Sequence, residues 1–188
     1  MILQNNINNY NPVQWISREL SSIHSFLCIL GSILYLGNFI NLTIWSYFIN
    51  LTIYYCIQDI YIVTVHNKYF NNIFEIVIHH IILIIFCFNY RIFNNLLAMG
   101  LLSESSSIFL NQTWMLHQMK KNNNKYFNII CIIILICFFL FRIINFSYLF
   151  YLTYNYSILL IYKIFLFVIL LLNVTWFTKL INKYKTLK

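Results

Sequence analysis

Apolar residues occur along this chain in long runs, each about as long as a helix that crosses a membrane. Such a helix needs about 20 residues to span the hydrocarbon core of a bilayer. The third run is shorter than this, and the fourth contains the polar stretch Ser103–Ser107. The pattern predicts an all-α fold, a polytopic transmembrane helical bundle of about six spans: Leu20–Phe39, Thr43–Val65, Ile73–Phe88, Leu96–Leu116, Phe127–Ile144 and Ser157–Leu180.

The composition supports this prediction, because 61% of the 188 residues are hydrophobic and only 9% are charged. A soluble domain has about 25% charged residues. So few charges cannot cover a water-facing surface, and most of the surface is expected to face lipid. No cleaved signal peptide is expected, so the first span would act as its own insertion signal.

No cluster of proline or glycine marks a second domain, and the only proline is Pro12. The start of the chain is rich in asparagine, a composition typical of disordered segments. We predict a polar, disordered arm over residues 1–14, a transmembrane domain over 15–182 and a basic cytosolic tail over 183–188.

Basic residues are distributed unequally between the two sides of the predicted bundle. Six crossings leave Arg91 as the only basic residue in the loops of one side, while Arg142 and Lys163 lie within spans. Lys and Arg mark the cytoplasmic face, so both termini are expected in the cytosol. The net charge of +8 then needs no nucleic acid as partner. The other side, with Lys179 at its border, collects Arg18, Lys68, Lys120, Lys121, Lys125, Lys183, Lys185 and Lys188.

Several titratable residues lie inside the predicted spans, where each costs about 2.5–3.5 kcal/mol to insert. At about 1.5 Å per helical residue, they lie about 6 to 18 Å from the cytosolic ends. Four different spans therefore place such a group between the cytosolic surface and the midplane. This pattern predicts one polar pocket that opens toward the cytosol, shared by His24, Asp59, His79, His80 and Glu104.

His79 and His80 point about 100° apart on a helix, so they cannot chelate one ion symmetrically. Glu75 shares the face of His79, four residues away. For His24, a simple hydrogen bond between helices is the competing interpretation. Arg142 has two interpretations that the sequence leaves open: it extends toward the membrane surface, or it holds a lipid phosphate.

Motifs of several enzyme classes are absent from the sequence. It contains no H-E-x-x-H zinc motif, no G-x-S-x-G elbow and no glycine-rich phosphate loop. The five cysteines show no metal-ligand spacing and are interpreted as small buried hydrophobes. We therefore expect no metal and no bound cofactor.

Five segments, in order, resemble the TLC-domain family of multi-pass membrane proteins, which includes ceramide synthases. The likeness is greatest to the transmembrane-protein-56-like branch. The pattern L-L-x-E-x-S-x-P-F-x-N-x-x-W of that branch is similar to residues Leu101–Leu116, in which Ile108 stands in place of the proline. The segments are "WISRELSSIHSF" (Trp15–Phe26), "IQDIYI" (Ile57–Ile62), "IHH" (Ile78–His80), "LLSESSSIFLNQTWML" (Leu101–Leu116) and "FFLFRI" (Phe138–Ile143).

The resemblance implies a membrane protein of lipid metabolism or lipid homeostasis, in the endoplasmic reticulum or another internal membrane, with membrane lipids as partners. An alternative is an acyltransferase that uses acyl-CoA as substrate. His79 or His80 would then act on the acceptor, assisted by Asp59 or Glu104. The candidate binding residues are Arg18, His24, Trp114 and Arg142.

One departure separates the chain from ceramide synthases. Those enzymes follow their histidine pair with an H-D-x-x-D element, whereas the aligned stretch here reads Ser103-Glu104-Ser105-Ser106-Ser107. The histidine and the second carboxylate are missing. The departure favours a protein that binds or senses lipids, and the histidine pair favours the enzyme, so both interpretations stay open.

The charge asymmetry predicts that epitope tags at the two ends of the chain are both cytosolic. In intact microsomes a protease should remove both tags without detergent, while a tag inserted beside Arg91 should be protected. Opposite accessibility of the two terminal tags would contradict the six-span topology.

Overall fold

The computed structural model describes residues 11–119, 125–154 and 160–186, and within these ranges it contains helices and no strand. Two segments are 3₁₀ helices, η2 (Asn67–Tyr69) and η3 (Leu102–Glu104), and one is a π-helix, η4 (Phe139–Ile144). The α-helices are α1 (Pro12–Leu36), α2 (Leu42–Val65), α3 (Ile73–Phe88), α4 (Tyr90–Leu101), α5 (Ser105–Gln118), α6 (Lys125–Phe138), α7 (Asn145–Tyr154) and α8 (Leu160–Thr186).

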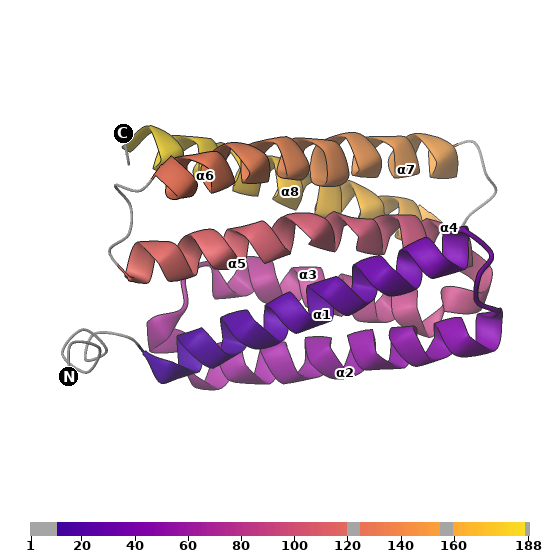
Figure 1. Cartoon of the computed structure of the whole chain (residues 1–188). Coiled ribbons are helices and arrows are strands. Elements are labelled where there is room, and N and C mark those ends of the chain that lie inside the picture. Colours follow the sequence, from indigo (N-terminus) through magenta and orange to yellow (C-terminus); the bar gives the residue numbers. More distant parts are fainter. Residues whose placement is uncertain (1–10, 120–124, 155–159, 187–188) are drawn as a thin grey trace.

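The described helices combine into six rods, because η3 joins α4 to α5 and η4 joins α6 to α7 without a break. The rods run roughly along one axis, with α6, α7 and α8 on one side of the bundle and α1 and α2 on the other (Figure 1). α1 begins at the same end at which α8 finishes. The predicted all-α bundle is therefore confirmed.

Four helical stretches are long and apolar enough to cross a membrane: Pro12–Leu36, Leu42–Val65, Tyr126–Tyr154 and Leu160–Lys185. The shorter apolar helix Ile73–Phe88 matches the third predicted span. The fourth predicted span is helical, as α4, η3 and α5, but it is not among these stretches. The fifth rod continues to Tyr154, ten residues beyond the predicted end at Ile144.

The first helix starts earlier than the apolar pattern predicts. The Asn11 side chain accepts a hydrogen bond of 2.9 Å from the Val13 backbone N–H, and Pro12 occupies the first turn. Both features favour a helix start at this point. Pro12, Val13 and Gln14 of the predicted disordered arm therefore belong to α1, while residues 1–10 lie outside the described residues. The predicted tail is helical as far as Thr186.

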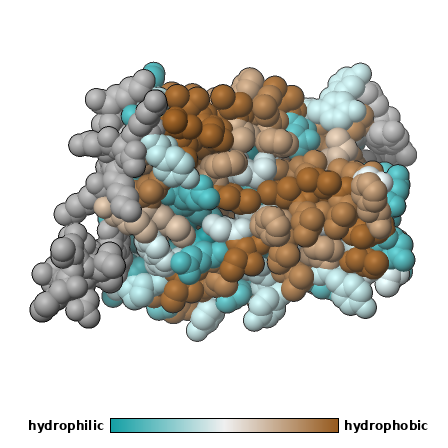
Figure 2. All heavy atoms as spheres, viewed as in Figure 1, coloured by the Kyte–Doolittle hydropathy of each residue, from teal (hydrophilic) through white to brown (hydrophobic). Residues whose placement is uncertain are grey.

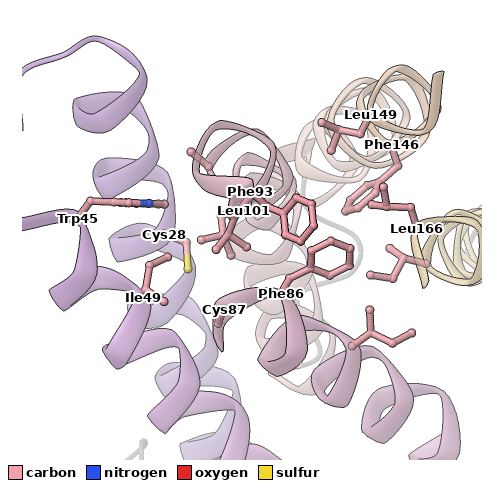
Figure 3. Packing of buried hydrophobic residues seen from close by; sticks show 14 residues of the cluster. Cys28, Trp45, Ile49, Phe86, Cys87, Phe93, Leu101, Phe146, Leu149 and Leu166 are labelled. Carbon is pink, nitrogen blue, oxygen red and sulfur yellow. The ribbon is translucent and has the colours of Figure 1, made fainter. Parts of the chain in front are cut away.

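One half of the bundle has an apolar core. Phe86 of α3, Phe93 of α4 and Leu166 of α8 pack together there, and Cys28, Trp45 and Ile49 lie beside them (Figure 3). On α1, α2, α3 and α8, these positions lie toward the end of the bundle at which α1 finishes. The half at which α1 begins is therefore left to the polar side chains.

Large apolar side chains also cover the outside of the bundle. Ile57 of α2 is 56% exposed, Tyr61 64% and Phe74 of α3 76%. Hydrophobic residues dominate the face shown in Figure 2 between its two ends. Such an exterior suits a lipid environment, in which exposed apolar area carries no penalty.

Candidate functional site

A cavity of about 340 Å³ lies in the polar half of the bundle, where α1, α2, α3, α5, α8 and the π-helix η4 converge. We call this cavity the central pocket. Trp114 is absent from its lining and lies in a neighbouring cavity instead. The structure brings together at the central pocket seven of the eight residues predicted from sequence: Arg18, His24, Asp59, His79, His80, Glu104 and Arg142.

His80 of α3 pairs with Asp59 of α2. Its Nε2 lies 2.9 Å from Oδ2 of Asp59, and the Ser17 hydroxyl of α1 donates to the other carboxylate oxygen at 3.3 Å. Both members of the pair are about nine-tenths buried. The His80 Nδ1 has no hydrogen-bond partner among the described residues. A proton on Nε2 would therefore leave Nδ1 as a free acceptor.

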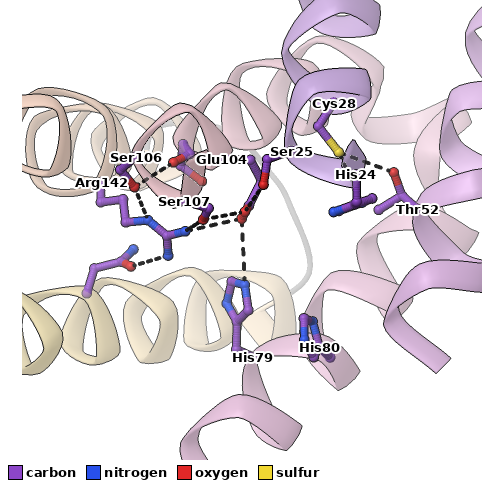
Figure 4. Close-up of polar contacts among 12 residues, drawn as sticks. His24, Ser25, Cys28, Thr52, His79, His80, Glu104, Ser106, Ser107 and Arg142 are labelled. Atoms are coloured by element: carbon purple, nitrogen blue, oxygen red, sulfur yellow. Dashed lines mark hydrogen bonds and ion pairs between the residues drawn. The ribbon is translucent and has the colours of Figure 1, made fainter. Parts of the chain in front are cut away.

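His79 faces a second carboxylate. Its Nε2 lies 4.0 Å from Oε1 of Glu104, and its ring packs edge-on against Trp176 of α8. Figure 4 shows His79 directed at Glu104 while His80 points elsewhere. The angular separation expected for adjacent helical residues thus gives each histidine a different carboxylate.

Arg142 contacts the same oxygen of the Glu104 carboxylate as His79 does (Figure 4). Its Nη2 donates to Oε1 of Glu104 at 3.3 Å and to the Ser107 hydroxyl at 2.7 Å. Its Nε donates to Ser106 at 2.7 Å, and Nη1 donates to Asn173 of α8 at 3.3 Å. Arg142 is only 5% exposed. The interpretation that Arg142 extends to the membrane surface is therefore wrong.

The π-helix η4 carries Arg142 into the bundle. A π-helical segment changes the register of a helix and occurs often at functional sites. The aromatic rings of Phe138 and Trp176 flank the guanidinium, 5.2 and 5.7 Å from its central carbon. A regular heptad or 3.6-residue pattern contains no signal for this placement.

His24 has its polar contact within its own helix. Its Nε2 lies 3.1 Å from the Cys28 sulfur, and Tyr55 of α2 stacks on its ring with centroids 3.9 Å apart. The interpretation as a hydrogen bond between helices is therefore wrong for His24, although the residue does line the pocket. Tyr55 was missed because it resembles any other aromatic residue of a span.

Glu75 joins α3 to α8 through Trp176 and Lys179, which both line the pocket. Its carboxylate accepts from the Lys179 ammonium at 2.6 Å and from the Trp176 indole N–H at 2.6 Å. Glu75 and His79 share a helix face, as their spacing predicts, but the ion pair of Glu75 is with Lys179. Trp176 and Asn173 were not predicted as site residues. They lie within the long apolar run of α8, and no motif or charge in that run marks them.

No group of three metal-ligating side chains that could hold an ion occurs in the described parts of the chain. What the site does provide is two imidazoles, each beside a carboxylate, within one cavity. Such an arrangement can bind a polar group by hydrogen bonds or pass a proton between an imidazole and a bound group.

Comparison with protein families gives the context of this site. The family model described as the TLC domain matches residues 14–182. The chain belongs to the TLC-domain family. All eight predicted site residues lie within the matched range of the TLC domain. Comparisons with curated proteins and with solved structures gave no match.

Membership and the apolar helices together establish an integral, multi-pass membrane protein. A TLC domain also indicates a function related to membrane lipids. The match does not extend to a particular branch of the TLC family, so the likeness to the transmembrane-protein-56-like branch stays a prediction.

The buried Arg142–Glu104 pair yields a test of stability. Removing one member leaves the other charge buried without its partner, which costs about 3–5 kcal/mol. We expect Arg142→Met and Glu104→Gln each to lower the Tm of the purified protein in detergent strongly. The double variant should lose much less than the sum of the two. Arg91→Gln, at an exposed position, serves as the control. Additive losses would show that the two side chains are not coupled.

Proposed function

We propose that this chain is a protein of membrane lipid metabolism or lipid homeostasis whose central pocket holds the polar group of a lipid. The observation that carries the proposal is the convergence of two histidine–carboxylate pairs on one cavity inside a lipid-facing bundle. Ionisable groups within a span are costly, and function is the default explanation for them.

The surroundings of the two pairs suit an amphiphile. A small apolar cavity of about 40 Å³ borders His79 and Glu104 on the side of the hydrophobic core, where Leu97 and Leu166 line it. A polar group among the histidines would therefore have an apolar region beside it for a hydrocarbon chain. Ligand sites generally combine apolar walls with a few placed polar groups in this way.

The pocket is proposed to open to the cytosol, in the endoplasmic reticulum or another internal membrane. Its rim includes Lys179 and Lys183, near the end of α8. Basic residues favour the cytosolic face. That end of the bundle also contains the start of α1 (Figure 1), which supports placing both termini on the cytosolic side.

A second candidate function is acyl transfer from acyl-CoA, favoured by the 2.9 Å contact between His80 and Asp59. A carboxylate-oriented imidazole can remove the proton from a lipid hydroxyl or amine. The acceptor oxygen or nitrogen would attack the thioester carbonyl, the carbon–sulfur bond would break, and the CoA thiolate would take up a proton. The missing H-D-x-x-D element weighs against this candidate.

Lipidomics of membranes that contain the wild-type chain or His79→Ala/His80→Ala tests the proposal. We expect the wild type, but not the double variant, to change the abundance of at least one lipid class. His66→Ala removes a histidine that lies outside the pocket and should behave as wild type. If the chain acylates a lipid, the acylated product should form about 10²–10⁴-fold more slowly when the base is removed.

Equal expression of the three proteins, and the same elution in gel filtration, are required for the comparison. Identical lipid profiles for the wild type and the double variant would contradict a role of the pocket. A composition change without any acylated product would select lipid binding over acyl transfer.

A further inference from the structure

A second, smaller cavity lies beside the central pocket, at the end of the bundle at which α1 begins. It has a volume of about 140 Å³ and is enclosed by α1, α5, α6 and α8. We call it the side pocket, and Arg18, Trp114, His117, Phe127, Ile134 and Lys183 are among its lining residues. Among the described residues, its lining includes two cationic side chains and a histidine, and no aspartate or glutamate.

Arg18 is a partly buried cation that lines both the side pocket and the central pocket. Its Nη1 donates to the neutral amide oxygen of Asn111 at 3.1 Å, and its guanidinium carbon lies 5.6 Å from the centre of the Trp114 ring. None of the four ion pairs within the described residues involves Arg18. Its sequence neighbour Glu19 accepts a hydrogen bond from Trp15 and does not line the side pocket. The Asp59 carboxylate acts on the Arg18 charge without forming an ion pair with it, so an anion that accepts hydrogen bonds directly from the guanidinium would stabilise this arrangement.

Two further nitrogen-bearing side chains line the same cavity. The Nδ1 atom of His117 is buried and has no hydrogen-bond partner in the described parts of the chain. Lys183 contributes an ammonium group from the last turns of α8. An anion in the side pocket would therefore meet Arg18 from α1, His117 from α5 and Lys183 from α8.

The remaining wall of the side pocket is apolar. Phe127 and Ile134 of α6 are almost completely buried there, and Cys131 and Leu135 lie on the same helix. A ligand that fills the cavity must therefore be amphiphilic, because its anionic part meets Arg18 while its other part meets hydrocarbon.

The position of the side pocket along the bundle matches the level of lipid head groups. Trp114 packs against Trp15 with ring centroids 6.1 Å apart, and Tyr184 also lines the cavity. Trp and Tyr concentrate at the boundary between membrane and water. Lipid phosphates lie at this boundary.

We propose that the side pocket binds the phosphate group of an anionic membrane lipid, whose acyl chain lies against α6. The planar guanidinium of Arg18 suits phosphate because it can donate two parallel hydrogen bonds. Basic pockets between membrane helices on the cytoplasmic side bind anionic head groups in this way. The proposal rests on the proposed function for its membrane setting only, since the histidine pair lies in the central pocket.

Titration of the purified full-length protein with dioctanoylphosphatidic acid, followed by native mass spectrometry in neutral detergent, tests this inference. Dioctanoylglycerol has the same chains without the phosphate and serves as the matched lipid. We expect phosphatidic acid to bind at least about tenfold more tightly, because dioctanoylglycerol lacks the phosphate that would accept charge-assisted hydrogen bonds from Arg18. Arg18→Gln should remove most of this preference, and Arg18→Lys should retain part of it.

Two further variants keep the test decisive if Arg18→Gln fails to fold. Lys183→Gln should weaken phosphatidic acid binding, while Arg91→Gln removes the same charge at an exposed site outside both cavities and should bind as wild type. Equal affinity for the two lipids would overturn the proposal. Wild-type affinity in folded Arg18→Gln and Lys183→Gln proteins would do so as well.

Inorganic phosphate provides the last arm of the experiment. If it displaces phosphatidic acid at equal concentration, the site recognises free phosphate and the lipid proposal is overturned. His79→Ala/His80→Ala is measured in parallel. An unchanged lipid profile in that variant refutes the proposed function of the central pocket. Because Arg18 lines both cavities, phosphatidic acid binding is also measured in the histidine variant: wild-type affinity is expected there, and its loss would overturn the side-pocket proposal.

Discussion

The ion pair between Arg142 and Glu104 is the interaction on which the polar half of this bundle depends. It joins η3 to η4 and, through Asn173, reaches α8. Glu104 in turn lies beside His79, and Ser107 donates to the same carboxylate at 2.7 Å. A buried carboxylate without a cation would be strongly unfavourable. Arg142 therefore stabilises the buried negative charge of Glu104 beside the histidines.

The division of the bundle into an apolar half and a polar half follows from this arrangement. The core around Phe86 and Phe93 supplies tight packing at one end (Figure 3), whereas the polar end leaves a cavity of about 340 Å³. The same helices serve both halves, and large apolar side chains cover much of their outer surface. The bundle thus gathers its buried ionisable side chains around a cavity between the helices.

Much of the fold followed from the length of the apolar runs, and five residues of the central pocket followed from the depth of polar residues within them. Asp59 and His80 could be placed in one layer by counting residues from the helix ends. Pairings could not be obtained in this way: Glu75 bonds to Lys179 of α8, although its spacing placed it on the face of His79. Arg142 depends on a π-helix, which breaks the helical period used for prediction. Tyr55 and Trp176 carry no signal that separates them from lipid-facing aromatics, and Trp114 shares a motif with Glu104 yet lies in the side pocket.

An experimental structure of the full-length protein in lipid nanodiscs tests the central claim most directly. We expect the Arg142 guanidinium within hydrogen-bond distance of the Glu104 carboxylate, with His79 and His80 turned toward the same cavity and Asp59 beside His80. An Arg142 side chain directed into lipid, or histidines on the outer surface of α3, would contradict the claim that these charges enclose one pocket.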